Sequence, residues 1–145
     1  MMRTILVAGA VTLGITAAVA QATNVIEQRK GLMRQNGAAT RTVSAMLRGQ
    51  APFELAQVQS ALQNYIQVGQ VYPSLFPDDS KTGNDTRALP AIWENRADFN
   101  AQNAKFVQDS QAALSAIKDE ATFKTEMPKV LGNCGACHQK YQRQG

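Results

Sequence analysis

The sequence predicts an all-α protein, an antiparallel four-helix bundle with one long crossover loop between its second and third helices. Three observations support this fold. Apolar side chains recur at helical spacing in four separate stretches of the chain. A long segment crowded with turn-forming residues separates the second stretch from the third. The 145 residues, 44% of them hydrophobic, suit one compact domain, and bundles with one long connection are a common arrangement of four helices.

The first two helices are expected at residues 24–48 and 52–71. The helical spacing of the first is broken only by two glycines, and Gly49 ends it. Pro52 then opens the second helix, because the N–H that proline lacks has no partner in a first helical turn. The apolar stripe of this helix consists of Leu55, Val58, Leu62, Tyr65, Ile66 and Gly69.

Residues 72–95 carry no helical pattern and are predicted to be the crossover loop. Proline, glycine, asparagine and aspartate are crowded together here, and all of them favour turns. A loop above about 15 residues inside a compact domain is usually functional or covers something. For Phe76 and Trp93, simple packing is the plainer interpretation. The apolar residues that could anchor the loop to the bundle are Leu75, Phe76, Leu89, Ile92 and Trp93.

The third helix is expected at residues 96–118, with Asn95 or Asp98 as its cap. A short turn leads to the fourth helix, in which Pro128 should start the main part of the helix or kink it near Lys124. The residues that share one face of the fourth helix, and so predict its core side, are Phe123, Met127, Val130, Leu131, Cys134, Cys137, His138 and Tyr141.

Both cysteines and the only histidine of the chain lie together in the fourth helix, as Cys134, Cys137 and His138. Cys-x-x-Cys-His is the pattern that attaches c-type haem, and on a helix its three side chains leave from one face. A structural zinc site needs about four ligands, and a thioredoxin-like pair accompanies a βαβ pattern. A plain disulfide or a chance match remains the alternative to covalent haem.

Residues 1–20 have the pattern of a signal peptide. Arg3 is their only charge, and an apolar run ends in a small-x-small pattern at Ala20. A membrane helix is the alternative, but the run is shorter than the about 20 residues that a span needs. We expect cleavage after Ala20 or Ala22, which leaves residues 21–145 as one domain exported to the periplasm.

Charge and motifs limit the possible functions. The net charge is +4 and the pI is near 9.3, but Lys and Arg are interspersed with Asp and Glu and no run of five like charges occurs, so nucleic-acid binding is not expected. No nucleophile, acid–base pair or phosphate loop stands out, so an enzyme is not expected either. One covalent haem in an exported bundle favours one-electron transfer with redox proteins as partners. A helical interaction protein without haem is a further alternative.

The sequence resembles the class II c-type cytochromes, which comprise the cytochromes c′ and their low-spin relatives. The similarity covers the whole chain after the leader and includes the order of the four helices. It rests on IEQRKGLMRQNG at residues 26–37, GNDTRALPAIW at residues 83–93, and CGACH at residues 134–138 followed by Tyr141.

This resemblance implies one haem c per chain, held by Cys134 and Cys137, with His138 as the proximal iron ligand. Met33 matches the position that faces the iron on the other side. In the low-spin relatives a methionine there is the sixth ligand, and this is the reading we favour. In cytochromes c′ a non-coordinating side chain leaves the iron open to nitric oxide or carbon monoxide. Gln142 replaces a basic residue common in cytochromes c′, which puts proximal gas chemistry in doubt. A methionine at helical spacing is otherwise more often core packing.

Five further residues match positions around the haem of the family. Arg29 and Lys30 match side chains that reach the haem propionates, and propionates favour nearby cations. A solvated pair on a helix surface explains these two residues equally well. Asp85, Thr86 and Arg87 match the loop that borders the haem edge. Because the family often dimerises through its first two helices, a homodimer through that pair is a further expectation.

Overall fold

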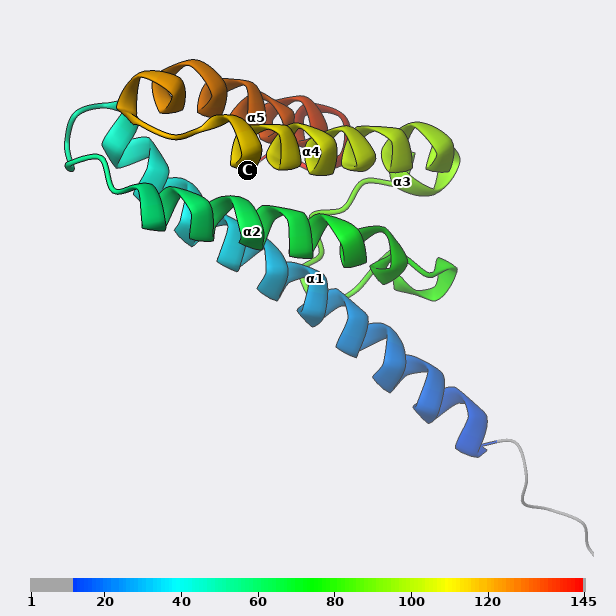
Figure 1. Ribbon diagram of the computed structural model, residues 1–145. Coiled ribbons are helices and arrows are strands. Elements are labelled where there is room, and N and C mark those ends of the chain that lie inside the picture. Colours follow the sequence, from blue (N-terminus) through cyan, green and yellow to red (C-terminus); the bar gives the residue numbers. More distant parts are fainter. Residues whose placement is uncertain (1–11, 145) are drawn as a thin grey trace, which may run out of the picture.

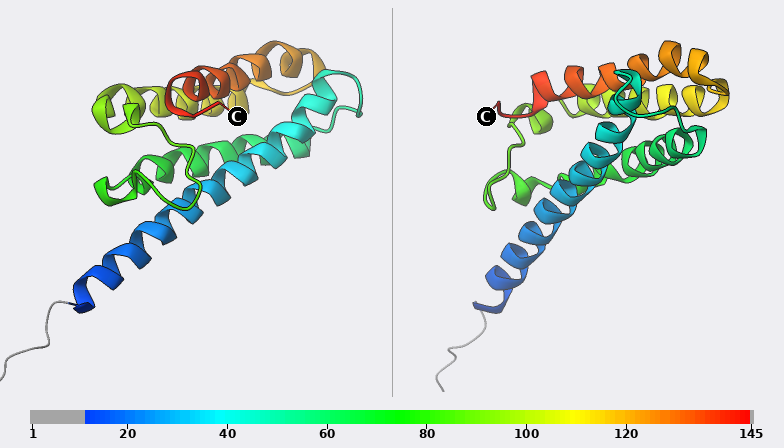
Figure 2. Two further views of the ribbon diagram at one scale, coloured as in Figure 1. Left: turned by 180° about the vertical axis from the view of Figure 1, so that it is seen from behind. Right: turned by 90° about the vertical axis from the view of Figure 1, so that its left-hand side faces the viewer.

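The computed structural model describes residues 12–144, with side chains from residue 24 onward. Figures 1 and 2 show α4 and α5 side by side on one side of the molecule and α1 and α2 on the other. The first part of α1 runs out beyond the other helices (Figure 1). The predicted all-α four-helix bundle is confirmed. Its long helices are α1 (Thr12–Leu47), α2 (Leu55–Val71), α4 (Arg96–Ala116) and α5 (Glu120–Tyr141).

The first helical pair differs from the prediction at the start of each helix. α1 is already helical at Thr12, the first described residue, and so extends before the predicted start at residue 24, through an alanine-rich stretch that favours helix. Gly49 ends α1 as predicted, with a φ of 68° in the left-handed region that favours glycine. α2 begins at Leu55 rather than Pro52, because Glu54 before it is still extended (φ −129°, ψ 100°).

The segment between α2 and α4 is the predicted crossover, but it is not irregular throughout. It contains two 3₁₀ turns, η1 (Tyr72–Leu75) and η2 (Asp78–Ser80), and the short helix α3 (Ala91–Glu94). The prolines favour these turns, because their fixed φ suits the first turn of a helix. Phe76 and Ile92 are buried, as predicted for residues that anchor this segment to the bundle.

The predicted side-chain cap of α4 is not formed, whereas α5 has a cap that was not predicted. Asn95 occupies the N-cap position of α4, but its side chain does not cap the helix. At α5, Asp119 and Thr122 form a reciprocal capping box: Oδ1 of Asp119 accepts from Thr122 N–H at 2.8 Å, and Thr122 Oγ1 accepts from Asp119 N–H at 3.1 Å. Pro128 lies inside α5 and does not start its main part. Lys124, whose carbonyl loses its helical partner, is exposed, so water can replace that hydrogen bond.

The buried core divides into two clusters. The larger cluster fills the end of the bundle near the α1–α2 and α4–α5 turns, and Val43, Leu62 and Phe123 in it are fully buried. The smaller cluster ties the crossover to α4 and to the end of α5, and consists of Phe76, Ile92, Phe99 and Tyr141. Its rings stack edge to face, with centroids 5.0 Å apart for Phe76–Phe99 and 5.3 Å apart for Phe99–Tyr141.

Gly69 lets α2 approach α4 closely. A Cβ at this position would overlap Cγ2 of Val107 and lie 3.5 Å from Cδ1 of Phe106. We therefore expect Gly69→Ala to lower the free energy of unfolding by about 1–3 kcal/mol, measured by urea denaturation. Gly132→Ala in α5 is the control, because no atom lies within 4 Å of its added Cβ. That variant should gain about 0.5–1 kcal/mol, and similar losses in both variants would contradict the packing argument.

Candidate functional site

The Cys-x-x-Cys-His motif lies on the inner seam of α5. The seam residues follow alternating steps of four and three, and are Phe123, Met127, Val130, Cys134, Cys137 and Tyr141. The four that are not cysteine are 0–3% exposed. Both cysteines and His138 are only half-buried. The seam is thus buried before and after the motif and more exposed at the motif itself. The predicted core-facing side of the helix is confirmed.

The two thiols are free and protonated at neutral pH. Burial raises the pKa of Cys134, and burial together with Cys134 and Asp98 raises the pKa of Cys137 to about 11. Disulfide formation proceeds through thiolates, so this environment does not favour a disulfide. Burial and the charge of Arg87 lower the pKa of His138, which favours the neutral imidazole that binds metals.

The cysteines lie between the two core clusters. Leu131 packs against the larger cluster and Cys137 against the smaller one. Two tyrosines are close by, Tyr65 in α2 and Tyr72 at the start of η1. Burial raises the pKa of Tyr65 to about 12 with a smaller contribution from Cys134, and burial and Cys137 raise the pKa of Tyr72. α5 packs along α4, whereas α1 packs along α2 and makes little direct contact with α5 within the described residues. The motif therefore lies at a break in the packed core.

The inner stripe of α1 shows a similar break. Asn36 Oδ1 accepts a hydrogen bond from Asn64 Nδ2 at 2.8 Å, and the Thr40 hydroxyl bonds that of Tyr65 at 2.9 Å, so this side of α1 faces α2. Met33 shares the stripe, is half-buried, and belongs to neither core cluster. Between Arg29 and Val43, α1 has no fully buried side chain. Two incompletely covered stripes, two thiols and one imidazole are a set of groups that fits a haem.

Arg29 is a buried guanidinium, not the solvated residue of the alternative interpretation. Only 3% of it is exposed, and it stands 4.6 Å from the centroid of the Phe76 ring. Nη1 donates to the Leu75 carbonyl at 3.1 Å and to Ser80 Oγ at 2.9 Å. Nη2 donates to the Ser80 carbonyl and to Thr86 Oγ1, both at 2.8 Å. These four acceptors are uncharged oxygens of the crossover, so Arg29 fastens the crossover to α1.

Of the other predicted site residues, Lys30 and Thr86 lie beside Arg29 and Arg87 does not. Thr86 accepts from Arg29, and Lys30 donates to the Asn84 carbonyl at 3.0 Å while pairing with Glu27 at 2.9 Å. Asp85 is exposed and has a positive φ of 49°. Arg87 is exposed and lies beside the C-terminal segment instead. The structure thus groups Arg29, Lys30 and Thr86, and separates Arg87 from them. Gln142 begins that C-terminal segment, just after α5.

Two contacts at the site were not expected from the sequence. Ser80 is fully buried and gives Arg29 two acceptors, its hydroxyl and its carbonyl. Tyr141 donates to Asp98 Oδ2, which also accepts from Lys140 at 2.7 Å and so ties the end of α5 to α4. Hydrogen bonds from Lys140 and Tyr141 lower the pKa of Asp98. No local sequence signal marks Ser80. The contact of Asp98 with Lys140 and Tyr141 joins residues that are distant in the sequence and become neighbours only when α4 and α5 pack together.

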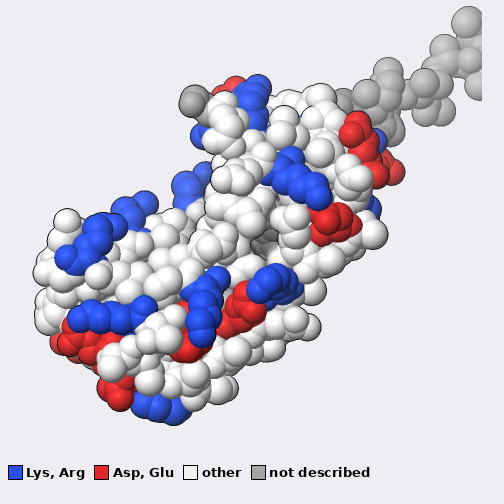
Figure 3. Space-filling model, turned by 90° about the horizontal axis from the view of Figure 1, so that it is seen from above, with Lys and Arg blue, Asp and Glu red and all other residues white. Residues whose placement is uncertain are grey.

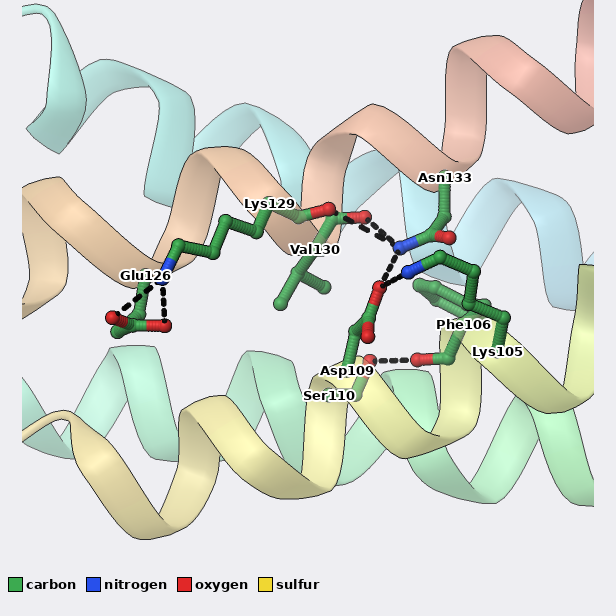
Figure 4. A network of polar contacts seen from close by, with 8 residues as sticks. All are labelled: Lys105, Phe106, Asp109, Ser110, Glu126, Lys129, Val130 and Asn133. Carbon is green, nitrogen blue, oxygen red and sulfur yellow. Dashed lines mark hydrogen bonds and ion pairs between the residues drawn. The ribbon is translucent and has the colours of Figure 1, made fainter.

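A polar network between α4 and α5 fixes the rotation of α5 (Figure 4). Asn133, next to Cys134, donates from Nδ2 to Asp109 Oδ2 at 2.8 Å, and Lys105 Nζ lies 2.5 Å from the same oxygen. This contact holds Asn133 against α4 and thereby helps to hold Cys134 on the inner seam. On the face in Figure 3, Lys and Arg side chains are mixed with Asp and Glu, as the interspersed charges of the sequence predict.

A four-helix bundle with Cys-x-x-Cys-His on the inner seam of its last helix defines a class of proteins, the helical-bundle haem proteins of c type. The family model described as Cytochrome C′ matches residues 24–142. The chain therefore belongs to the cytochrome c′ family of class II c-type cytochromes, which carry covalently bound haem c, and the predicted resemblance is confirmed.

Individual relatives agree with this assignment. A cytochrome c′ of Rhodopseudomonas palustris is 48% identical over 136 residues, which cover 94% of this chain and 92% of that protein. A cytochrome c-556 of Agrobacterium fabrum is 36% identical over 129 residues, which cover 88% of this chain and 87% of the relative. A solved structure of cytochrome c′ from Rhodopseudomonas palustris superimposes with a TM-score of 0.81 at 46% identity, covering 83% of this chain and 96% of that one.

Proposed function

We propose that this protein is a periplasmic one-electron carrier, with haem attached through Cys134 and Cys137 and with His138 as the proximal ligand of the iron. The observation that carries the proposal is the seam of α5, which is fully buried on both sides of the motif and half-buried at it. The haem supplies a one-electron couple, and the helices hold it in place and limit its contact with water. Redox proteins are the expected partners.

Export and domain organisation belong to the same proposal. Residues 1–20, or 1–22, are removed as a signal peptide and residues 21–145 form the mature domain. The start of the family match at residue 24 supports this division. The leader lies partly in residues 1–11, which are outside the described part of the chain. None of the helices within residues 12–144 combines the length and the hydropathy that a membrane span requires.

The haem propionates are assigned to the end of the site near Arg29. This guanidinium donates only to uncharged oxygens, so an anionic group would complete its environment. Lys30 lies next to it and Thr86 shares its hydrogen bonds, which supports a role for both at this edge. Asp85 and Arg87 have weaker support, because Asp85 is exposed and Arg87 lies beside the C-terminus.

A homodimer through α1 and α2 remains a prediction. α2 supports it, because its residues Leu55–Val71 carry no charged side chain, unlike α4 and α5. Such a surface costs less to bury against a second copy than a charged one does. Sedimentation of the purified protein at several concentrations measures the association directly.

A second candidate function is the capture of nitric oxide or carbon monoxide at a five-coordinate iron. Its support is the higher identity to the relative named cytochrome c′, 48%, than to the one named cytochrome c-556, 36%. The visible spectrum of the reduced protein tests both functions. A sharp α-band indicates six-coordinate iron and the electron carrier, a broad band indicates an open site, and the absence of a Soret band would remove haem altogether.

The role of Met33 distinguishes the two proposed functions. If it supplies the sixth ligand, we expect Met33→Ala to replace the sharp α-band with a broad one and to raise carbon monoxide affinity at least about tenfold, or ~1.4 kcal/mol. Absorption spectra and carbon monoxide titration measure both effects. Met46→Ala is the control: Met46 lies in the larger core cluster, so it should lower stability and leave the spectrum unchanged. An unchanged spectrum and affinity in Met33→Ala would favour gas binding.

A further inference from the structure

The crossover pairs with the C-terminal segment directly after α5. Leu89 N–H donates to the Tyr141 carbonyl at 3.0 Å, and Arg143 N–H donates to the Arg87 carbonyl at 2.8 Å. Ala88 and Gln142 form an antiparallel β-bridge between these two bonds. This short ladder fixes the backbone of the crossover against the last turn of α5.

The Arg87 side chain adds further hydrogen bonds between the crossover and the C-terminal segment. Its Nε and Nη2 both donate to the Arg143 carbonyl, at 3.0 and 2.7 Å. Two bonds from one planar guanidinium restrict its direction as well as its distance. Arg87 is therefore an exposed cation that is held in a defined position, and its described contacts are with backbone oxygen and not with a carboxylate.

This position lies beside the turn of α5 that carries His138. Gln142 N–H donates to the His138 carbonyl at 3.1 Å, and Gln144 Nε2 donates to the same carbonyl at 3.2 Å. The C-terminal segment that pairs with Arg87 is thus hydrogen-bonded to the last turn of α5, which carries His138.

We propose that Arg87 is a positioning residue that holds a fixed positive charge beside the proximal histidine and thereby raises the reduction potential of the haem. The inference rests on the proposed function, in which His138 binds the iron. An oxidised haem centre carries one more positive charge than the reduced one, so a nearby cation disfavours the oxidised state. The role comes from the crossover, a segment far from the motif in sequence, and is distinct from propionate binding.

Midpoint potentials of haem-loaded full-length variants test this role. Arg87→Gln is expected to shift the reduction equilibrium about threefold towards the oxidised state, or about 30 mV at ~59 mV per tenfold change. Arg87→Met should give the same shift as a second neutral variant. Arg87→Lys keeps the charge and should stay near the wild-type value. Lys118→Gln removes the same charge before the start of α5, at the opposite end from His138, and should leave the potential unchanged.

Salt provides an independent readout, because Arg87 is exposed. The difference between wild type and Arg87→Gln should shrink when the Debye length falls from ~30 Å at about 0.01 M salt to ~3 Å at about 1 M. The inference is overturned if both neutral variants keep the wild-type potential, or if Arg87→Lys shifts as much as they do. A wild-type protein that lacks covalent haem overturns the proposed function and this inference together, whereas intact haem with an unmoved potential overturns the inference alone.

Discussion

The double variant Cys134→Ala, Cys137→Ala is expected to lose all covalently attached haem. Both cysteines lie on the inner seam of α5, four and seven residues after the buried Val130, so their sulfurs leave from the same side of the helix. The chain contains no third cysteine that could replace them. Extraction with acidified organic solvent followed by mass spectrometry of the intact chain measures the attachment. The expected result is a polypeptide of apoprotein mass and haem in the organic phase.

A matched control lies inside the same motif. Gly135 stands between the two cysteines, and no atom lies within 4 Å of a Cβ added to it. Gly135→Ala should therefore keep both thioether bonds and the haem mass. Each single cysteine variant should retain one bond and part of the haem. If the double variant still carries haem after extraction, attachment through these cysteines is wrong.

The sequence was sufficient to predict the elements of this fold because their signals are local. Apolar spacing located the four long helices, and Gly49 marked the end of the first. The errors have physical causes that act at helix ends. Pro52 suits a first helical turn, yet α2 begins only after Glu54, whose backbone is extended. Pro128 is accommodated inside α5, because the neighbouring exposed surface gives water access to the unpaired carbonyl.

The candidate site was predicted less completely, because much of it depends on distant contacts. The Cys-x-x-Cys-His spacing is a local pattern and identified the inner face of α5. The surroundings of Arg29 could not be read in the same way, because two of its four acceptors are backbone carbonyls, which every residue has. Its partners Leu75, Ser80 and Thr86 are 46 to 57 residues away in the chain. Charge alone could not distinguish this buried guanidinium from the half-exposed Lys30 beside it.

Arg29→Met is expected to be the most destabilising single change in the crossover region, lowering the free energy of unfolding by about 2–4 kcal/mol. Methionine can keep part of the packing against Phe76 but donates no hydrogen bond. The four oxygens that Arg29 satisfies would lose their donor in a buried or partly buried setting. Urea denaturation measures the stability, and amide hydrogen exchange over residues 72–95 measures local opening of the crossover.

Lys30→Met is the control for this prediction, because it removes the adjacent cation from the same helix. Lys30 is partly exposed and its ion pair with Glu27 lies on the surface, so the change should stay within about 0.5 kcal/mol. Hydrogen exchange should accelerate in the crossover of Arg29→Met and stay near the wild-type rate in the second half of α4, where Ala113 packs in the larger core cluster away from the crossover. If the two variants lose the same free energy of unfolding, the positive charge of this segment is what stabilises it, and the buried hydrogen bonds of Arg29 are not.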